Sequence, residues 1–334
     1  MLKYRVACIL VLFIICIISP AFSQQKYPLK ITVSQDGRAD YSTIQDAINS
    51  VRDLGNERVT IFVRNGIYTE KLIVPGWKTN ISIIGETMDS TIITGNDYSG
   101  KQMPGGKSNG LTKYTTYTSF TVLVDGNGTV LENLTIENTA GAVGQAVALH
   151  ANADRLTVRN CRILGNQDTL YTSKENNRQY YDHCFVSGTT DFIFGEATCV
   201  FSACTIESLA NSYITAAAQR EGQRFGYVFI NCKLVAAKGV DKVFLGRPWR
   251  PYAKTVFINT EMGAHILPEG WFHWPGDSMF PEKEKTALYG EYGSTGKGGD
   301  ASRRISWSRK LSKNEIKNYA LKNIFKIDGE WDLF

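Results

Sequence analysis

Three polar residues in the middle of the chain are separated by equal intervals. Gln145, Asp168 and Asp191 stand at positions i, i+23 and i+46, among short apolar runs and turns. If one coil of a repeating β-structure has this length here, the three side chains form a column with one member per rung, about 5 Å apart. Two carboxylates at that distance do not both ionise near neutral pH, because each charge raises the pKa of the other group. Asp168 and Asp191 can therefore supply an acid together with a base or a nucleophile.

A cation and two amides complete this constellation. Arg247 stands between a glycine and a proline, and an arginine can hold a carboxylate through two hydrogen bonds. Gln145 and Gln167 carry neutral N–H donors, which suit a developing oxyanion. Trp249, shortly after the arginine, offers a flat face to a sugar ring. Taken alone, Asp168 also fits a turn carboxylate that caps backbone N–H groups; the column favours the chemical role.

A unit of strands and turns recurs through the same region. One equivalent position recurs along the chain at intervals of 27, 23, 20, 28 and 28. Its occupants are Leu134, Cys161, Cys184, Cys204, Cys232 and Thr260. Helical repeats would need two amphipathic helices per unit, and propeller blades take about 40 residues or more. Units of this length must stack to bury their apolar faces, so the sequence predicts an all-β fold, a right-handed parallel β-helix (solenoid).

The recurring cysteines favour buried thiols. Five cysteines follow Ser23; four of them share the equivalent position, and Cys199 is the other one. We expect an inward-facing ladder of small apolar groups. The alternative is a disulfide framework, which an exported protein can form, although an odd number leaves one thiol free. A metal site is less favoured, because no C-x-x-C pair or histidine cluster accompanies the cysteines.

Helices are expected only at the ends of the solenoid. Residues 41–54 carry apolar side chains at helical spacing, and Ser42 with Gln45 forms a capping box. This helix should cover the open N-terminal end and shield its strand edges. A second helix, starting at Ser312 with Glu315 in a capping box, should pack on the outside. The polar, glycine-rich stretches expected as surface loops are residues 95–118 and 275–303.

The N-terminus has the pattern of a secretory signal peptide. Lys3 and Arg5 precede a short apolar run, Val6–Ile18, and a small-x-small pattern ends at Ser23. We therefore expect residues 1–23 to be removed, leaving residues 24–334 as a single domain that is secreted or periplasmic; an uncleaved anchor is the alternative. Loss of the two basic residues lowers the net charge from +5 to +3. That weak charge indicates no nucleic-acid partner.

Several motifs in one order resemble those of the pectin methylesterases. The resemblance covers nearly all of the chain after Ser23. The matching stretches are Gly66–Glu70, Asn138–Gly141, Gln145–Leu149, Gly165–Tyr171, Asp191–Gly195, Leu245–Trp249 and Glu291-Tyr292. Each stretch is weak evidence alone, but together and in family order they are specific. The resemblance implies a right-handed parallel β-helix that removes methyl esters from polygalacturonate.

The resemblance also implies a role for each polar residue. Asp191 matches the nucleophile that attacks the ester carbonyl. Asp168 matches the general acid that protonates departing methanol and then acts as a base toward water. Gln145 and Gln167 match the amides that hold the oxyanion, and Arg247 matches the residue that orients Asp191 and keeps it ionised. No metal or organic cofactor is implied.

Aromatic residues are expected to line the substrate groove. Trp249 matches a groove aromatic of the family, and the remaining candidates are Tyr171, Phe194 and Trp271. Two departures from the family pattern are His150, where many relatives carry arginine, and Phe120, where a smaller residue is common. They bear on subsite preference rather than on the reaction.

The implied function is hydrolysis of galacturonate methyl esters in pectin, which releases methanol and pectate. The partners would be methylated homogalacturonan and water, with no nucleic acid and no membrane, and the enzyme would be a monomer. A pectin-chain hydrolase or lyase of the same fold is one alternative, since two carboxylates about 5 Å apart also fit glycosidase geometry. However, the Asn-Thr-Asp and Gly-His-Gly signatures of polygalacturonases and a cluster of acidic calcium ligands are absent from the sequence. A non-catalytic carbohydrate-binding solenoid is the other alternative, which would not need Asp168, Asp191 and Arg247 together.

Overall fold

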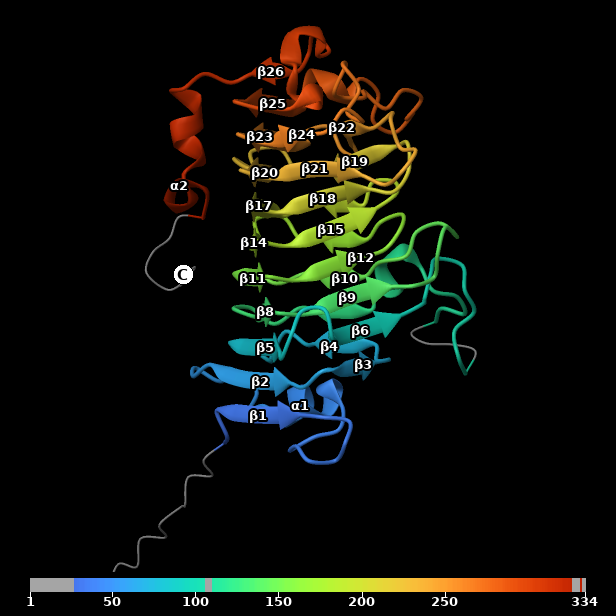
Figure 1. The fold of residues 1–334 in the computed structure, drawn as a ribbon, viewed down its shortest axis with the longest axis vertical. Helices are drawn as coiled ribbons and strands as arrows, with labels where there is room; N and C mark the ends of the chain where they lie inside the picture. The colour runs from blue at the N-terminus through green and yellow to red at the C-terminus, as the bar shows by residue number, and fades with distance from the viewer. Residues whose placement is uncertain (1–26, 106–109, 326–330, 332–334) are drawn as a thin grey trace, which may run out of the picture.

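The computed structural model describes residues 27–105, 110–325 and 331. Its strands stack in coils along one axis, from β1 near the N-terminal end to β26 at the opposite end (Figure 1). Three sheets run along this axis, and each coil from β2 to β22 gives one strand to sheet A, then one to sheet B, then one to sheet C. The predicted parallel β-helix is confirmed. The predicted signal peptide, residues 1–23, lies outside the described residues.

The three sheets contain all the named strands. Sheet A has 11 strands in the order β1 (Lys30–Val33), β2 (Val59–Val63), β5 (Ile81–Gly85), β8 (Val130–Glu132), β11 (Leu156–Arg159), β14 (Arg178–Asp182), β17 (Thr198–Ser202), β20 (Tyr227–Ile230), β23 (Lys254–Ile258), β25 (Leu288–Tyr292) and β26 (Arg309–Lys310). Sheet B has eight strands in the order β24 (Glu261–Met262), β21 (Lys233–Ala236), β18 (Thr205–Ser208), β15 (Phe185–Gly188), β12 (Arg162–Leu164), β9 (Thr135–Asn138), β6 (Thr91–Gly95) and β3 (Gly66–Tyr68). Sheet C has seven strands in the order β22 (Phe244–Pro248), β19 (Tyr213–Ala217), β16 (Ile193–Gly195), β13 (Leu170–Thr172), β10 (Leu149–Ala151), β7 (Val122–Val124) and β4 (Leu72–Val74).

A left-handed residue turns the chain from sheet A into sheet B in successive coils. Asparagine tolerates this backbone conformation better than most residues, and it holds four of these positions. The residues with positive φ at this corner are Asn133, Asn160, His183, Ala203, Asn231 and Asn259. The amide of Asn160 also donates to the amide oxygen of Asn133 on the preceding coil, at 2.6 Å. Each corner determines that the side chain of the next residue points into the interior.

The residue after each corner forms the predicted ladder. Cys161, Cys184, Cys204 and Cys232 are at most 2% exposed, and each follows one of these corners. Cys199 lies on β17, outside the ladder, and is also buried. All five are free thiols, which confirms the prediction of unpaired cysteines for the described residues.

Aromatic side chains stack inside the solenoid for the same geometric reason. Tyr181, Phe201, Phe229 and Phe257 are paired in register on four neighbouring strands of sheet A. Their ring centroids are 4.6, 4.6 and 4.4 Å apart. These values are close to the rung spacing of a parallel sheet. In-register pairing therefore converts a sequence repeat into a continuous core.

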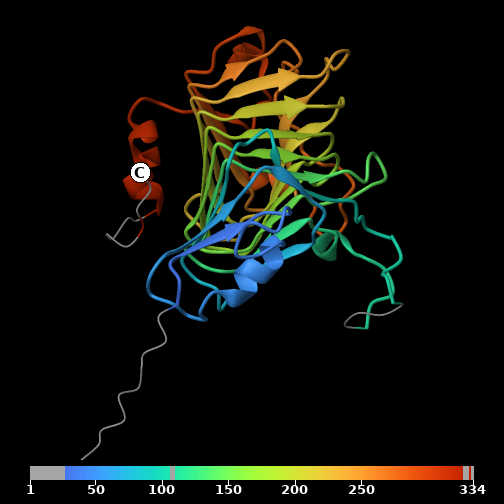
Figure 2. The ribbon, with the colours of Figure 1, turned by 60° about the horizontal axis from the view of Figure 1, so that its bottom comes forward.

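A short helix covers the N-terminal end of the coils (Figure 2). This helix, α1 (Ile44–Ser50), buries Ile44, Ala47 and Ile48 and contacts β1, β2 and β4. Both carboxylate oxygens of Glu70 accept hydrogen bonds from its first turn, from the backbone N–H groups of Ile44 and Gln45, at 3.0 Å each. An anion at this end also interacts favourably with the helix dipole. The predicted capping of the solenoid is confirmed.

The start and length of α1 differ from the prediction. The helix was expected over residues 41–54 with a capping box from Ser42 to Gln45. Instead, Thr43 is the N-cap and accepts from the backbone N–H of Asp46 at 3.2 Å. The side chain of Gln45 bonds with the backbone of β4 instead, so a tertiary contact displaces the local cap.

The C-terminal segment packs on the outer face of sheet A (Figure 1). The capping box at Ser312 and Glu315 forms, with hydrogen bonds of 2.8 and 3.2 Å. The helix is broken, however, into a 3₁₀-helix, η5 (Glu315–Tyr319), and α2 (Leu321–Phe325). The burial of Phe325 against strand residues of sheet A confirms the outside position.

The two stretches expected as loops carry more structure than predicted. Residues 95–118 include η1 (Thr116–Thr118). Residues 275–303 include β25 and three 3₁₀-helices: η2 (Lys283–Lys285), η3 (Lys297–Gly299) and η4 (Ala301–Arg303). The charged residue Glu291 made the β25 stretch look polar, so no strand was predicted there. In the structure, Nε of Arg304 lies 2.7 Å from a carboxylate oxygen of Glu291 and pairs with its charge. Among the described residues, no helix is long and apolar enough to cross a membrane.

The buried ladder predicts the behaviour of the thiols. In the folded chain without residues 1–23, we expect none of the five cysteines to react with an aromatic disulfide reagent, because the reagent cannot reach them. After unfolding in guanidinium without reductant, all five should react. Absorbance of the released thiolate counts them. Fewer than five reactive thiols in the unfolded chain would contradict the unpaired ladder.

Candidate active site

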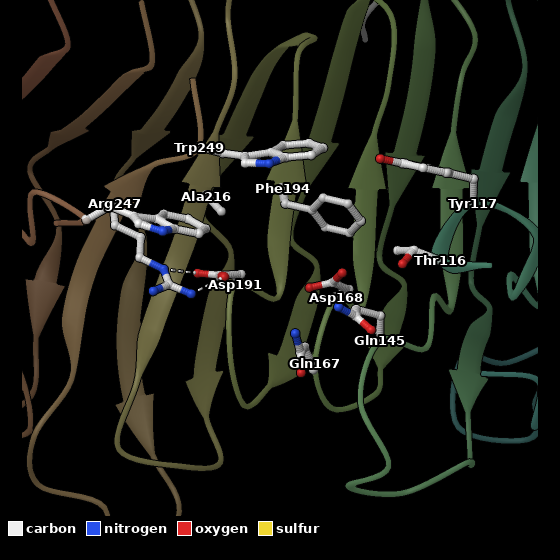
Figure 3. Close-up of a pocket in the computed structure, with 11 residues that line it drawn as sticks. Thr116, Tyr117, Gln145, Gln167, Asp168, Asp191, Phe194, Ala216, Arg247 and Trp249 are labelled. Carbon is white, nitrogen blue, oxygen red and sulfur yellow. Dashed lines mark hydrogen bonds and ion pairs between the residues drawn. The ribbon is translucent and has the colours of Figure 1, made fainter. Parts of the chain in front are cut away.

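The outer face of sheet C holds a cavity of about 300 Å³. Its floor comes from neighbouring strands and the turns before them, and its walls come from the longer loops (Figure 3). The residues that line it are Thr116, Tyr117, Gln145, Gln167, Asp168, Asp191, Phe194, Ala216, Arg247, Trp249 and Trp274. All five polar residues singled out in the sequence therefore meet in one place.

The two aspartates occupy equivalent positions on neighbouring coils. Leu170 of β13 pairs with Ile193 of β16, and the same offset of 23 in sequence number relates Asp168 to Asp191. The backbone N–H of Asp168 donates to the carbonyl of Thr190 at 3.2 Å, which is the bond this register requires. Both aspartates have positive φ, 64° and 49°. Such backbone conformations in non-glycine residues are often found at functional sites.

Gln145 does not join this column, so that part of the prediction is wrong. It pairs with Gln167, the residue just before Asp168. The offset in sequence number is 22 at this bridge and 21 between β10 and β13, where Leu149 pairs with Leu170, rather than 23. Coil length varies because turns absorb extra residues without disturbing the ladder. The two amides consequently lie beside each other, next to the carboxylate pair.

Arg247 holds Asp191 with two hydrogen bonds. The guanidinium Nε donates to one carboxylate oxygen at 3.0 Å, and Nη2 donates to the other at 2.7 Å. The side-chain exposure of the two partners is 18% and 9%. The preceding residue must be glycine, because a Cβ at Gly246 would lie 1.9 Å from the hydroxyl of Thr215. That close approach lets the strand carry Arg247 over the carboxylate.

Two aromatic rings fix the guanidinium plane. Its carbon lies 4.0 Å from the ring centroid of Tyr213 and 3.6 Å from that of Trp274. Cation–π attraction adds to the ion pair in such a desolvated place. Arg247 therefore has little freedom to leave Asp191.

Burial and charge give the two carboxyl groups different protonation. Burial, reinforced by the nearby charge of Asp191, raises the pKa of Asp168 to about 8. Burial also raises the pKa of Asp191, but the hydrogen bonds and charge of Arg247 and the charge of Lys283 oppose this rise. Because the guanidinium binds Asp191 and not Asp168, the shared proton resides on Asp168. At neutral pH the site thus contains one carboxylate and one carboxylic acid.

The predicted aromatic residues divide into three on the groove face and one in the core. His150, Tyr171, Phe194 and Arg247 stand at one register position across sheet C. The rings of Tyr171 and Phe194 stack at 4.6 Å, and Phe194 lies 5.9 Å from Trp249. Phe194 and Trp249 line the cavity, whereas Tyr171 lines a neighbouring hollow together with His150.

Trp271 is not a groove residue, which corrects the prediction. It is 1% exposed and packs against Phe257 and Tyr289 at 5.8 and 4.5 Å. Trp271 pairs with Gly246, at a position that faces the interior. The next residue, Arg247, faces the groove. Successive positions of a strand point to opposite faces, so one step in register decides the outcome.

Comparison with known proteins identifies the family of this chain. The family model described as Pectinesterase matches residues 30–329. The chain belongs to the pectinesterase family. Pectinesterase 31 of Arabidopsis thaliana is 37% identical over 305 residues, covering 90% of this chain and 93% of the relative. The probable pectinesterase/pectinesterase inhibitor 64 of the same plant is also 37% identical, over 326 residues.

Coverage of the plant relatives is unequal. The match to the pectinesterase/pectinesterase inhibitor 64 covers 90% of this chain but 51% of that protein. For the pectinesterase/pectinesterase inhibitor 18 of the same plant, the shares are 84% and 50%. The chain thus spans about half the length of these two pectinesterase relatives.

Solved structures of the family have the same fold. The pectin methylesterase from carrot superposes with a TM-score of 0.76 at 32% identity, covering 89% of this chain and 92% of the carrot chain. The pectin methylesterase PemA from Erwinia chrysanthemi gives a TM-score of 0.76 at 27% identity, covering 91% and 98%. The parallel β-helix is therefore shared across the family members compared.

Four residues of the pectinesterase cavity were missed from the sequence, and one of them, Ala216, is a small residue of β19 that gives no signal of its own. Thr116 and Tyr117 lie in η1, inside the stretch expected as a loop. Trp274 lies shortly after Trp271 and precedes a Pro-Gly turn, much as Trp249 follows a proline. An aromatic residue beside a turn proline was the available signal. Among the described residues, no group of three or more histidine, cysteine, aspartate or glutamate side chains is placed to hold a metal ion.

Replacing Asp168 by asparagine should stabilise the fold, more at pH 7.5 than at pH 4.5. The unfolded carboxyl ionises near pH 4, but the folded one keeps its proton to about pH 8. Folding therefore takes up a proton in this window, and the stability of the unmodified protein falls as the pH rises through it. The gain in unfolding free energy should be larger at pH 7.5 by on the order of 3 kcal/mol.

Urea denaturation of both proteins at the two pH values measures this difference. Asp89→Asn is a matched control, because the Asp89 side chain is 70% exposed. Equal gains for Asp168→Asn at both pH values would show that Asp168 is ionised in the fold.

Proposed function

We propose that this protein hydrolyses the methyl esters of galacturonate units in pectin and releases methanol and pectate. The observation that carries the proposal is the buried pair of carboxyl groups on one face, with Arg247 bound to Asp191 and the proton on Asp168. Family membership supports the same reaction. One similar solved structure is that of a pectin methylesterase in complex with a hexasaccharide, at 27% identity.

In the first step Asp191 acts as the nucleophile. Its carboxylate attacks the carbonyl carbon of the methyl ester at C6 of galacturonate and forms a tetrahedral intermediate. The amides of Gln145 and Gln167 lie beside the carboxylate pair and donate to the oxyanion. Collapse of the intermediate breaks the bond to the methoxy oxygen. Asp168 gives its proton to that oxygen, so methanol leaves and an acyl–Asp191 anhydride remains.

In the second step Asp168 acts as the base. Now ionised, it takes a proton from a water molecule that attacks the acyl carbon. The same amides hold the second oxyanion. Asp191 then departs as a carboxylate, Asp168 is protonated again, and the sugar carries a free carboxyl group that ionises in water. Arg247 favours the charged form of Asp191 at the start and at the end of this cycle.

The substrate would lie along the aromatic face of sheet C. We assign Trp249 and Phe194 to the sugar unit at the cavity and Tyr171 to its neighbour, because Tyr171 lines the adjoining hollow of about 370 Å³. Aromatic rings that line a hollow suit the apolar faces of pyranose units. The chain would act as a monomer on methylated homogalacturonan and water, without a metal or organic cofactor.

We further propose that residues 1–23 are a cleaved signal peptide and that residues 24–334 work as one domain outside the cytoplasm. The basic start, the short apolar run and the small-x-small pattern support export. Pectin is a cell-wall polymer, so an exported esterase would meet its substrate.

The proposed reaction predicts one product pattern. The protein with residues 24–334, given highly methylated pectin, should release methanol without new reducing ends and without unsaturated product. Asp191→Asn should lower methanol release by at least about 10³-fold, because the amide is no nucleophile, while the fold stays intact by circular dichroism. Reducing ends or absorbance of unsaturated product without methanol would contradict esterase activity. Near-normal methanol release by Asp191→Asn would remove Asp191 as nucleophile.

The two tryptophans should respond differently to truncation. Trp271→Ala should lower the unfolding free energy by about 3–5 kcal/mol, because it empties a core position. Trp249→Ala should keep most of that stability but raise the KM for methylated oligogalacturonate, because its ring faces the cavity. Denaturant unfolding and initial rates of methanol release measure both effects. A stability loss in Trp249→Ala as large as that in Trp271→Ala would contradict the assignment.

A further inference from the structure

A fully buried lysine lies behind the proposed active site. The side chain of Lys283, in η2, is 0% exposed, and its Nζ lies 2.7 Å from a carboxylate oxygen of Asp277. Lysine is almost never fully buried unless it is paired. The Asp277 carboxylate also accepts from the backbone N–H groups of Met279 and Phe280, at 3.1 and 3.3 Å. This ion pair therefore closes the loop that runs from Trp274 to η2.

The indole of Trp274 contacts two cations. Its ring centroid lies 3.6 Å from the guanidinium carbon of Arg247 and 4.5 Å from Nζ of Lys283. Tyr213 contacts the same guanidinium at 4.0 Å. Cation–π attraction strengthens where water is excluded. Lys283 thus helps to hold the Trp274 ring, which packs against the guanidinium that is bound to Asp191.

The charges around Asp191 make this arrangement electrostatic as well as mechanical. The charged and titratable groups that act on Asp191, or on which its charge acts, are Arg247 from β22, Lys283 from η2, Asp168 from the turn before β13 and Tyr289 from β25. Lys283 in turn is influenced by Asp277, Arg250 and Arg247. Two cations therefore favour the ionised form of Asp191, and of these Arg247 makes the direct hydrogen bonds.

We propose that Lys283 is a positioning residue for the nucleophile: through Trp274 it holds the Arg247 guanidinium on Asp191, and its charge favours the carboxylate of Asp191. The kinetic part of this inference rests on the proposed esterase function. The mechanism above needs Asp191 ionised and needs Arg247 in place, and Lys283 serves both needs from outside the cavity.

The test compares pH profiles of kcat/KM for three variants. Lys283→Met keeps the aliphatic stem and removes the charge, so the acidic limb should move to higher pH by about half a unit or more, and kcat should fall. Lys285→Met is the matched control, because it removes a lysine of the same 3₁₀-helix whose side chain is 63% exposed. Its acidic limb should stay in place. An acidic limb of Lys283→Met that coincides with that of Lys285→Met would overturn the proposal.

Asp277→Asn keeps the test decisive if Lys283→Met does not fold. This variant removes the negative charge of the pair, while its amide oxygen can still accept a hydrogen bond from Nζ and keep the loop closed. Lys283 is protonated at the acidic pH of the limb, and its charge is then no longer offset by Asp277. The acidic limb should therefore move to lower pH, opposite to Lys283→Met. A purely structural role for Lys283 predicts reduced stability and an unmoved limb in Asp277→Asn, and that outcome would also overturn the proposal.

A measurement without turnover separates this inference from the proposed function. In protein labelled with ¹³C at the aspartate carboxyl carbons, the Asp191 signal can be assigned by its loss in Asp191→Asn. Its titration should move to higher pH in Lys283→Met and not in Lys285→Met. If the unmodified protein releases no methanol but this shift occurs, the esterase proposal fails and the role of Lys283 stands. If methanol is released and the titration does not move, the role of Lys283 fails alone.

Discussion

In-register pairing of parallel strands fixes the distance between equivalent residues of neighbouring coils at about 4.8 Å, and most of this molecule follows from that constraint. In the interior it brings Tyr181, Phe201 and Phe229 into a continuous stack with centroid spacings of 4.6 Å. On the outer face of sheet C the same spacing brings two carboxyl groups together, which isolated turns would keep apart. The energy that stacks the core therefore also overcomes the unfavourable approach of Asp168 and Asp191.

The approach of two acids is useful only because their surroundings are unequal. Arg247 meets Asp191 with two hydrogen bonds, whereas only its more distant charge acts on Asp168. Burial then drives the proton to Asp168, whose pKa rises to about 8. One strand register thus yields two chemically different groups from identical side chains. The two acids differ because Arg247 lies on β22. This strand stacks on β19, so the difference depends on the order in which the coils stack.

Holding an arginine over a buried carboxylate takes a second layer of contacts. Gly246 permits the close approach of β22, Tyr213 and Trp274 hold the guanidinium, and the loop from Trp274 to Lys283 holds Trp274. Gly246 and Tyr213 belong to β22 and β19, whereas Trp274 and Lys283 come from a part of the chain with no strand repeat. The solenoid supplies the spacing of the acids and the strand that carries Arg247, and the loop from Trp274 to Lys283 helps to hold Arg247 in place. A repeat protein can thus have a functional site that no single repeat contains.

The sequence by itself determined the features that depend on local chemistry or on a constant period. The recurring position that the ladder cysteines share revealed the coils, and the interval between Asp168 and Asp191 proved structural because β13 and β16 keep the same offset. Only the tertiary structure decided the features that depend on register across coils of unequal length. Gln145 pairs with Gln167 because the preceding coil is shorter, and Trp271 is buried because it stands opposite Gly246. A shift of one residue in register moves a side chain from the groove to the core. The number of residues in a turn cannot be predicted from the sequences of the strands on either side of it.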